Sequence, residues 1–513
     1  MKPTNSLFMN RTVYIFLCCL LPLCHLSEAT ARSWTYGHVL RRNLWNLSEN
    51  VAGIRQDSLS RSYAEVYGKW SSGGFRDSWQ ATDTWSAGAV TESIRHFDKF
   101  SLKGAFSFDQ TEGYGMCGSM FMKPGYYPLD VLEFTPGRKT CQTYALEGGF
   151  SADLAPKWRL GAKVDFSSAN LAKRKDLRHM NWRLDMTVAP GFMYHNGPFS
   201  VGAAYVFSKN SEVIESEQAG SSEFSYYAFL DKGMMYGTYS VWDGSGVHLA
   251  EEGIKGFPLK EIKNGASVQF AAGDFFADVQ YLHSSGTAGE KESVWFRFPG
   301  DEVALKAGYR VVHGESCHYV RFGMDWKRQV TDESVLEKVS ENGVASVVFH
   351  GSNRIAERRI WGLAPEYEFV SGLWELKARG EVRGVNSLSS QMYPYLYSQE
   401  LVTFSADVSA LAHIWKFDVG VALGCAGGLL EEQGRMASDG SGVQTSPFRL
   451  QDWYDLQMEY KTAPRINAAL SCRFWCWKGL YCRVAAEWAH GFGLSHIMGV
   501  DRWGASLGVG YEF

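Results

Sequence analysis

Apolar and polar residues alternate along most of this chain with a period of two. In residues 503–513, Trp503, Leu507 and Phe513 fall on one face, and the other face carries glycine, serine and glutamate. A period of two places successive side chains on opposite faces of a β-strand, so each such segment predicts a strand with one apolar face. The same alternation recurs in residues 100–108, 144–154, 158–166, 199–207, 303–311, 320–326, 374–382, 402–414, 415–425, 450–460 and 480–488.

These segments are long for strands. Most of them contain about 9 to 13 residues, whereas strands of globular proteins cluster near about five or six residues. A tilted strand needs about 9 to 11 residues to cross a lipid bilayer. We therefore predict an all-β fold, namely a transmembrane antiparallel β-barrel of about 18 strands, within a range of about 14 to 20.

The polar faces of these segments carry charges of both signs. The charged side chains that share one parity are Arg321, Glu366, Glu368, Glu375, Lys377, Arg379, Glu381, Arg383, Arg473, Arg483 and Glu487. In a secreted soluble β protein such a face meets water, and in a membrane barrel it lines the lumen. We predict that these side chains line a lumen, and that their mixed signs give no strong preference for anions or cations.

Aromatic residues favour the membrane barrel over the soluble alternative. The chain contains 31 Phe, 25 Tyr and 18 Trp, which together make 14% of its residues. Tryptophan and tyrosine collect where hydrocarbon meets lipid headgroups, so rings at strand ends predict two aromatic belts. These rings include Trp158, Trp326, Trp415, Trp477 and Trp488. The net charge of −4 argues against a nucleic-acid partner.

The first 60 residues divide into two parts. Residues 1–31 combine a basic start, a short apolar stretch and the small-residue sequence Ala29-Thr30-Ala31, which predict a cleaved signal peptide. In residues 32–60, apolar side chains recur at helical spacing. These side chains are Leu40, Leu44, Leu47, Val51 and Ile54. We predict a short helical segment that either plugs the lumen or caps the periplasmic rim, followed by an outer-membrane barrel over residues 61–513.

Three stretches without clean alternation predict loops. The longest is residues 208–265, and the shorter ones are residues 384–399 and 427–449. A long insertion in a barrel is usually an outer loop, which can fold inward and narrow the mouth. Predicted short turns at residues 461–465 and 477–479 follow each other directly, although short turns and long loops should alternate. This conflict indicates either one wrong strand or one unusually short outer loop.

No pattern of residues predicts catalysis, a metal site or a cofactor. Glu366 and Glu368 lie on one face of a predicted strand, where a salt-bridge network explains them better than acid and base catalysis does. Ser495 and His496 are neighbours on the chain, so on a strand they point to opposite faces and do not form a nucleophile and its base. We therefore expect that the protein is not an enzyme.

Two further groups of residues leave alternatives open. The densest basic cluster either binds an anionic headgroup or solute, or forms a solvated turn. Its members are Lys173, Arg174, Lys175 and Arg178. Cys117 and Cys141 flank one predicted loop, where they either form a disulfide or remain free thiols.

The carboxy terminus and two longer blocks resemble known barrel proteins. Tyr511 and the terminal Phe513 resemble the signature by which bacterial outer-membrane barrels are recognised for assembly. Residues 123–137 and 170–176 look like recurring segments of an uncharacterised outer-membrane β-barrel family of Bacteroidetes-type bacteria. These resemblances imply a location and a fold, with the barrel-assembly machinery as a partner through Phe513, and they imply no activity.

A shorter motif lies in the predicted helical segment. The stretch with Asn50, Ala52 and Gly53 is similar to the Asn-Pro-Ala hatch motif of long-chain fatty-acid and hydrocarbon transporters, although Val51 stands in place of the proline. The resemblance implies that these three residues belong to a hatch or plug.

Three classes of function fit the predicted outer-membrane barrel. The first is a passive channel or transporter for a solute, embedded in outer-membrane lipid. The second is a structural or secretion-associated barrel that docks an envelope partner protein. The third, an outer-membrane hydrolase, has no motif in its favour.

Overall fold

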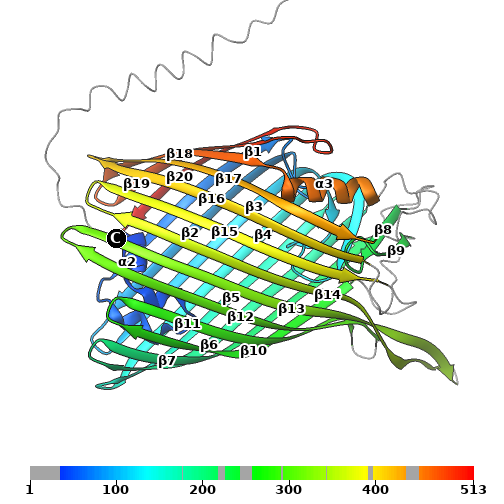
Figure 1. Cartoon of the computed structure of the whole chain (residues 1–513), viewed down its shortest axis with the longest axis horizontal. Helices are drawn as coiled ribbons and strands as arrows, with labels where there is room; N and C mark the ends of the chain where they lie inside the picture. The colour runs from blue at the N-terminus through cyan, green and yellow to red at the C-terminus, as the bar shows by residue number, and fades with distance from the viewer. Residues whose placement is uncertain are drawn as a thin grey trace, which may run out of the picture. The chain divides into compact units, whose positions relative to one another are not determined.

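The computed structural model describes residues 35–175, 177–217, 226–242, 257–290, 293–341, 344–390, 397–434 and 450–513. The predicted signal peptide, residues 1–31, lies outside these ranges. Eighteen strands of the described residues form one closed sheet (Figure 1). These strands are β1 (Arg61–Gly73), β2 (Asp83–His96), β3 (Phe100–Ser119), β4 (Asp130–Ala155), β5 (Trp158–Lys173), β6 (Arg178–Asn196), β7 (Phe199–Glu217), β10 (Phe257–Ala272), β11 (Phe275–Glu290), β12 (Ser293–His313), β13 (Ser316–Glu341), β14 (Val344–Val370), β15 (Trp374–Ser389), β16 (Tyr397–Ile414), β17 (Phe417–Gln433), β18 (Arg465–Trp477), β19 (Leu480–Gly491) and β20 (Asp501–Glu512).

The sheet closes on itself through antiparallel pairs. Each strand pairs with its neighbour in the chain, β7 pairs with β10, and β1 pairs with β20. Closure leaves no unpaired sheet edge, which is the condition for placing strands in lipid. The predicted all-β class and antiparallel barrel are confirmed, and the strand number equals the central prediction.

The outward face of the barrel is an apolar band. Leu470, Leu507 and Val408 are 58%, 58% and 61% exposed, which is unusual for aliphatic side chains in water and expected of side chains that meet lipid. Trp415 and Trp477 lie at the turns that begin the band. Trp488 lies eight residues after the first residue of β19, close to the length that crosses a bilayer.

The two ends of the barrel differ in their connections. At the end that holds the carboxy terminus, which we call the turn end, strands connect through two or three residues. The opposite end, which we call the loop end, carries the longer connections and the far ends of β13 and β14, which are 26 and 27 residues long. Short turns on one side and long loops on the other are typical of outer-membrane barrels.

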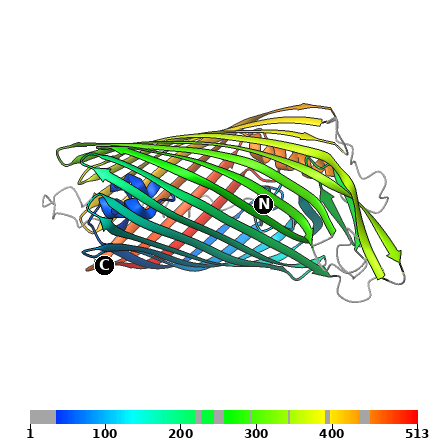
Figure 2. The ribbon, with the colours of Figure 1, turned by 90° about the horizontal axis from the view of Figure 1, so that it is seen from below.

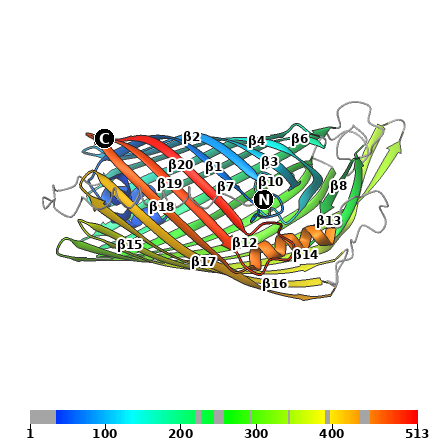
Figure 3. The same cartoon turned by 90° about the horizontal axis from the view of Figure 1, so that it is seen from above.

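One predicted strand is wrong. Residues 450–460 belong to helix α3 (Leu450–Thr462), which lies at the loop end between β17 and β18 (Figure 3). Its buried residues are Leu450, Tyr454 and Met458, which recur every four positions and therefore share one helix face. The residues at 461–465 are accordingly the end of a helix and not a turn between strands, which removes the conflict between consecutive short turns.

The predicted long loop over residues 208–265 is also wrong in its bounds. Strand β7 continues to Glu217 and β10 begins at Phe257. Between them lies a hairpin of β8 (Tyr226–Asp231) and β9 (Gly237–Trp242), and β8 pairs with the start of β4. The predicted loops at 384–399 and 427–449 likewise begin inside strands, because β15 extends to Ser389 and β17 to Gln433.

The amino-terminal segment is helical in three short pieces. They are α2 (Tyr36–Arg42) and the 3-10 helices η2 (Leu44–Leu47) and η3 (Val51–Gln56). The side chains of Asn43 and Asn50 accept hydrogen bonds from the backbone N–H groups of Trp45 and Ala52. Such caps start a new helical turn, so they break the single helix that apolar spacing predicts into three pieces.

Candidate functional site

The amino-terminal pieces lie inside the barrel at its turn end (Figure 2). We call residues 36–56 the inner plug. On one side, Arg41 donates to Glu368 of β14 at 2.5 Å and to Glu375 of β15 at 2.9 Å. On the other side, Lys163 of β5 contacts Glu49 at 2.9 Å. Since β5 and β14 are separated by several strands in both directions around the ring, the inner plug is tied to opposite walls.

Asn50, Ala52 and Gly53 lie where the plug touches the wall most closely. The Asn50 side chain is fully buried, and its Nδ2 donates to the carbonyl of Phe192 at 3.0 Å and to Gln269 Oε1 at 2.7 Å. Ser151 of β4 donates to the carbonyl of Ala52 at 3.0 Å. These contacts connect the plug backbone to strands β4, β6 and β10.

Glycines make this close approach sterically feasible. A Cβ atom at Gly191 of β6 would lie 2.6 Å from Asn50 Oδ1, and one at Gly161 of β5 would lie 2.5 Å from the Ala52 nitrogen. A Cβ atom at Gly53 itself would lie 2.2 Å from the ring of Trp45. The plug therefore fits a surface from which side chains are absent.

Asn50 also lies near a gap in the β6–β7 ladder. Pairing is absent at Ala189 and Pro190 and resumes in the same register at Gly191. Proline has no N–H and cannot complete a ladder hydrogen bond. The carbonyl of Ala203, which pairs with Phe192 two residues beyond the gap, accepts from Asn50 Nδ2 at 3.3 Å, so the inner plug supplies a donor close to this part of the wall.

The ion-pair partners of Arg41 and Glu49 shift the pKa values of these two groups of the inner plug. Burial lowers the pKa of the Arg41 guanidinium, but Glu375 and Glu368 outweigh burial, and the net pKa lies above its ordinary value. Burial raises the pKa of Glu49, but Lys163 outweighs burial, and the net pKa lies below its ordinary value. Both groups are therefore charged at neutral pH, and each is paired.

The charged residues predicted on the polar faces fall into small groups. Arg321 Nη1 donates to Glu366 at 2.6 Å and to Glu368 at 2.9 Å. Lys377 contacts Glu366 at 2.7 Å, and Glu375 contacts the inner plug. These residues of β13, β14 and β15 come together beside Arg41.

Other predicted residues lie apart from that group. Arg379 pairs with Glu381 at 3.1 Å, and Arg383 lies 3.8 Å from Asp325. Arg483 pairs with Glu65 of β1, and Arg473 lies 3.6 Å from Glu512. Glu487 is exposed on the face of β19 that it shares with Arg483. The mixture of signs extends around the barrel.

The predicted basic cluster does not form one site. Lys173 is buried and donates to Glu133 of β4, whereas Arg174, Lys175 and Arg178 are exposed. A single anion therefore does not meet all four cations.

A second segment occupies the lumen at the loop end. We call residues 120–129, between β3 and β4, the outer loop. The Tyr126 hydroxyl donates to Glu261 of β10 at 2.8 Å, and the Met122 N–H donates to Glu212 of β7 at 2.9 Å. The Tyr127 hydroxyl donates to Asn210 of β7. The outer loop is thus attached to the inner wall of the barrel.

The outer loop packs in an apolar core. The core unites the loop with β8 and with the inward faces of several wall strands at the loop end. Its fully buried members include Met120, Leu129, Ile214, Phe257, Phe298 and Ile355. Along β10, the inward side chains change from Phe257 and Leu259 to Glu261 and Lys263, so the lumen is apolar at the loop end and charged in its middle.

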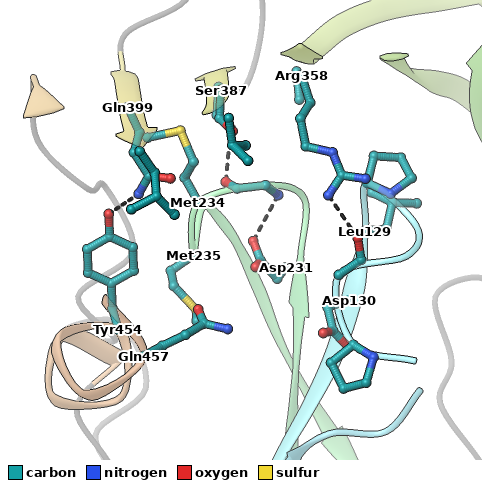
Figure 4. Close-up of a pocket in the computed structure, with 18 of the residues that line it drawn as sticks. Leu129, Asp130, Asp231, Met234, Met235, Arg358, Ser387, Gln399, Tyr454 and Gln457 are labelled. Carbon is teal, nitrogen blue, oxygen red and sulfur yellow. Dashed lines mark hydrogen bonds between the residues drawn. The ribbon is translucent and has the colours of Figure 1, made fainter. Parts of the chain in front are cut away.

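A cavity of about 370 Å³ lies beside the outer loop (Figure 4). We call it the outer cavity. Its walls come from the outer loop, the β8–β9 hairpin, α3 and strands β14 to β16. Residues around it include Leu129, Asp231, Met234, Arg358, Tyr454 and Lys461. The alternation pattern gave no indication of the outer loop, because its wall partners are about 80 or more positions away in the chain.

The described residues show neither a metal cluster nor a spanning helix. Within them, no group of three or more His, Cys, Asp or Glu side chains is placed to hold a metal ion. No helix in the same ranges is long and apolar enough to cross a membrane. Cys117 and Cys141 are both free thiols in the structure.

The geometry defines a closed antiparallel β-barrel with an apolar outer band and two segments inside its lumen. The chain belongs to the family of unknown function DUF6850, whose model matches residues 51–513. No curated protein matches the chain.

Several solved structures are similar to the chain at low sequence identity. The copper transporter OprC has a TM-score of 0.38 at 7% identity, and the match covers 89% of this chain and 80% of that chain. The FrpB iron transporter from Neisseria meningitidis, in its apoprotein form, has a TM-score of 0.43 at 8% identity, with 88% and 81% covered. The outer membrane protein opdK from Pseudomonas aeruginosa has a TM-score of 0.32 at 8% identity, with 89% and 99% covered. The names of these three structures do not include a fatty-acid transporter, and the resemblance of the Asn50 motif to such transporters stays a prediction.

Proposed function

We propose that this protein is a bacterial outer-membrane barrel that passes a small solute through a gated lumen, and that the inner plug is the gate. The apolar outer band would lie in lipid, with the turn end toward the periplasm. Export through the predicted signal peptide is part of this proposal.

The observation that carries the proposal is the way in which the inner plug is held. Among the described residues, no wall strand pairs with residues 36–56. The segment is attached through side chains, such as Arg41, Glu49 and Asn50, and through small apolar contacts. A segment that contributes no ladder hydrogen bonds can move without opening the barrel wall.

The lumen charges support a polar path through the middle of the barrel. Arg321, Glu366 and Lys377 are only partly buried, with side chains that are 14%, 18% and 43% exposed. Both signs are present, so the path would carry polar solutes without strong selection by charge in this part.

Flux into liposomes tests the proposal. Proteoliposomes that contain the wild-type protein would be compared with Arg41→Ala, which removes both ion pairs of that residue. We expect faster uptake of small sugars by Arg41→Ala, because the plug loses its link to β14 and β15. Lys69→Ala, a wall residue that does not contact the inner plug, is the control. Equal uptake by all three proteins, at the rate of empty liposomes, would contradict the proposed gate.

A further inference from the structure

We propose that the outer cavity binds a small amphipathic anion, such as an aromatic or short-chain carboxylate. The inference rests on the proposed transport function, because it names the solute class that the barrel would take. It also makes a separate claim about binding, which can be tested without transport. Four observations carry it: unpaired cations, occupied carboxylates, an apolar lining and a strained turn.

Two cations of the outer cavity, Arg358 and Lys461, have no described carboxylate within ion-pair distance. Arg358 of β14 donates to the carbonyls of Gly125 and Tyr126 at 3.0 and 3.3 Å and to Gln329 Oε1 at 3.2 Å, and within the described ranges its side chain has no ion pair. Its buried Nε has no hydrogen-bond partner among the described residues. The ammonium of Lys461 on α3 has neither a hydrogen bond nor an ion pair with any described residue. An anion would complete the coordination of both groups.

The carboxylates of the outer cavity are already occupied. Asp130 accepts from the Ser119 hydroxyl and from the Val131 N–H, both at 2.7 Å. Asp231 accepts from the Gly233 N–H at 2.8 Å. Burial raises the pKa of Asp231 to about 6 and that of Asp130, which precedes the lipid-facing part of β4, to about 8.

A third carboxylate of the lining is neutralised by wall cations. Glu357 accepts from Arg328 at 2.9 Å and contacts Arg359 at 2.8 Å. The remaining cation of the lining, Arg383, lies 3.8 Å from Asp325 and is half exposed. Arg358 therefore carries a positive charge with no carboxylate in ion-pair contact, whereas burial lowers the pKa of Lys461, a shift that Asp77 and Asp231 oppose.

Apolar and aromatic side chains form one part of the lining, beside uncharged polar residues such as Ser387 and Gln457. Leu129, Trp453 and Met458 contribute to the cavity wall together with the two methionines at the tip of the β8–β9 hairpin. A volume of about 370 Å³ is at the small end of ligand sites, which run from about 300 to 1,000 Å³. The size suits one small molecule with an apolar body, and it excludes a long acyl chain or an oligosaccharide.

The β8–β9 turn is strained where it meets the cavity. Met234 and Met235 have φ of 56° and 58°, and the Tyr236 N–H donates to the carbonyl of Gly233 at 3.0 Å across them. Both central residues of this tight turn are left-handed, a conformation that favours Asn and Gly. Methionine at these positions costs folding free energy, and such local strain concentrates at functional sites. The side chains of these two methionines form part of the apolar lining of the cavity.

Calorimetry on the detergent-solubilised full-length protein tests the inference. The probes are 4-phenylbutyrate, 4-phenylbutanol and 4-phenylbutylamine, which share one apolar body and differ in charge. We expect saturable binding of 4-phenylbutyrate, at least tenfold weaker binding of the alcohol, and no binding of the amine. Equal affinity for the three probes would overturn the inference, since it would show that charge plays no part.

Variants locate the binding to the outer cavity. Arg358→Gln and Lys461→Gln should each weaken 4-phenylbutyrate binding about tenfold, which corresponds to about 1.4 kcal/mol. Arg358→Lys keeps the charge and should bind more tightly than Arg358→Gln, which separates loss of charge from disturbance of the outer loop. Arg354→Gln is the matched control, because Arg354 is an exposed cation of the same strand outside the cavity. If Arg354→Gln weakens binding as much as the cavity variants do, the inference is wrong.

The strained turn provides an independent variant. Met234→Asn should raise the thermal midpoint, because asparagine tolerates the left-handed conformation, and should weaken 4-phenylbutyrate binding several-fold. Unchanged binding would show that the turn does not form the site.

Liposome flux separates this inference from the proposed gate. Binding of 4-phenylbutyrate without flux would contradict the transport proposal alone. Flux without selective binding would contradict the anion site alone.

Discussion

The inner plug at the turn end and the outer loop at the loop end both occupy the lumen, but different contacts hold them. The inner plug is fixed to opposite walls by ion pairs, by Asn50 and by two small apolar clusters. The outer loop is part of one extended apolar core, in which Met120, Phe257 and Phe298 are fully buried. Ion pairs at a partly wet boundary contribute little each, whereas buried apolar side chains contribute several times more.

Because of this difference, we expect the inner plug to move more easily than the outer loop. Moving the inner plug would exchange ion pairs for hydrated charges at a modest cost, and would expose two apolar clusters that are smaller than the outer core. Moving the outer loop would expose a core to water, at a cost similar to local unfolding. We therefore expect the turn end to open and the loop end to stay folded around the outer cavity.

The largest expected effect comes from the outer core. Phe298→Ala should destabilise the loop end by about 3 to 5 kcal/mol, because it removes a fully buried ring. The measurement is the thermal midpoint of the protein in detergent, together with proteolysis of the outer loop. Phe199→Ala, which removes a ring that is 56% exposed on the outward face, should have a much smaller effect. Equal effects of the two variants would mean that the loop end is not a core.

The next effect concerns the closest plug contact. Asn50→Ala should weaken docking of the inner plug by about 1 to 3 kcal/mol, because buried carbonyls of β6 and β7 lose their donor. Gly191→Ala should act in the same direction by pushing Asn50 away. Both should increase the cleavage of the plug by added protease. Gly148→Ala, where a new Cβ meets nothing within 4 Å, is the control.

A pH dependence follows from Glu49. Its pKa is lower in the docked plug than its ordinary value of about 4.3, so its contribution to docking is present above that value and is lost as the pH falls through the lowered pKa. The loss should be at most about 1 kcal/mol, because the pair is partly exposed. Liposome flux of the wild type should rise below about pH 4, and Glu49→Gln should show higher flux at neutral pH with no such rise.

The smallest effect is expected at Lys175, an exposed member of the predicted basic cluster. Lys175→Gln should change the free energy of unfolding by no more than about 0.5 kcal/mol, since the side chain is exposed. The measurement is the thermal midpoint of the protein in detergent. Lys173→Gln should cost more, about 1 to 3 kcal/mol, because the buried Glu133 loses one charged donor and keeps Lys139 at 3.3 Å. Equal thermal midpoints of the two variants would contradict the burial of the Lys173 side chain.

The sequence predicted the barrel because lipid imposes a strict alternation on the strands that cross it. Residues 503–513 and 480–488 show this pattern clearly, and both are strands. In residues 450–460 the apolar positions also fit a helix. The structure has a helix there, with Leu450, Tyr454 and Met458 buried on one face. Local periodicity cannot distinguish the two when the partner surface is unknown.

Only part of the candidate site could be predicted from the sequence. The motif around Asn50 lies in the segment that the structure places inside the lumen, but the partners of Asn50, Phe192, Ala203 and Gln269, lie far away in the chain. The outer loop contains Pro124, Gly125 and Pro128, which indicate a turn and give no direction for it. Its inward direction depends on contacts with β7 and β10, which only the closed barrel brings near.

Single-channel recording in planar bilayers tests the central claim most directly. The wild-type protein and the double variant Arg41→Ala and Asn50→Ala would be recorded under the same voltage and salt. If the inner plug is the gate, the wild type shows rare or small openings and the double variant shows long openings of higher conductance. Identical records from the two folded proteins would contradict the gate and the account built on it.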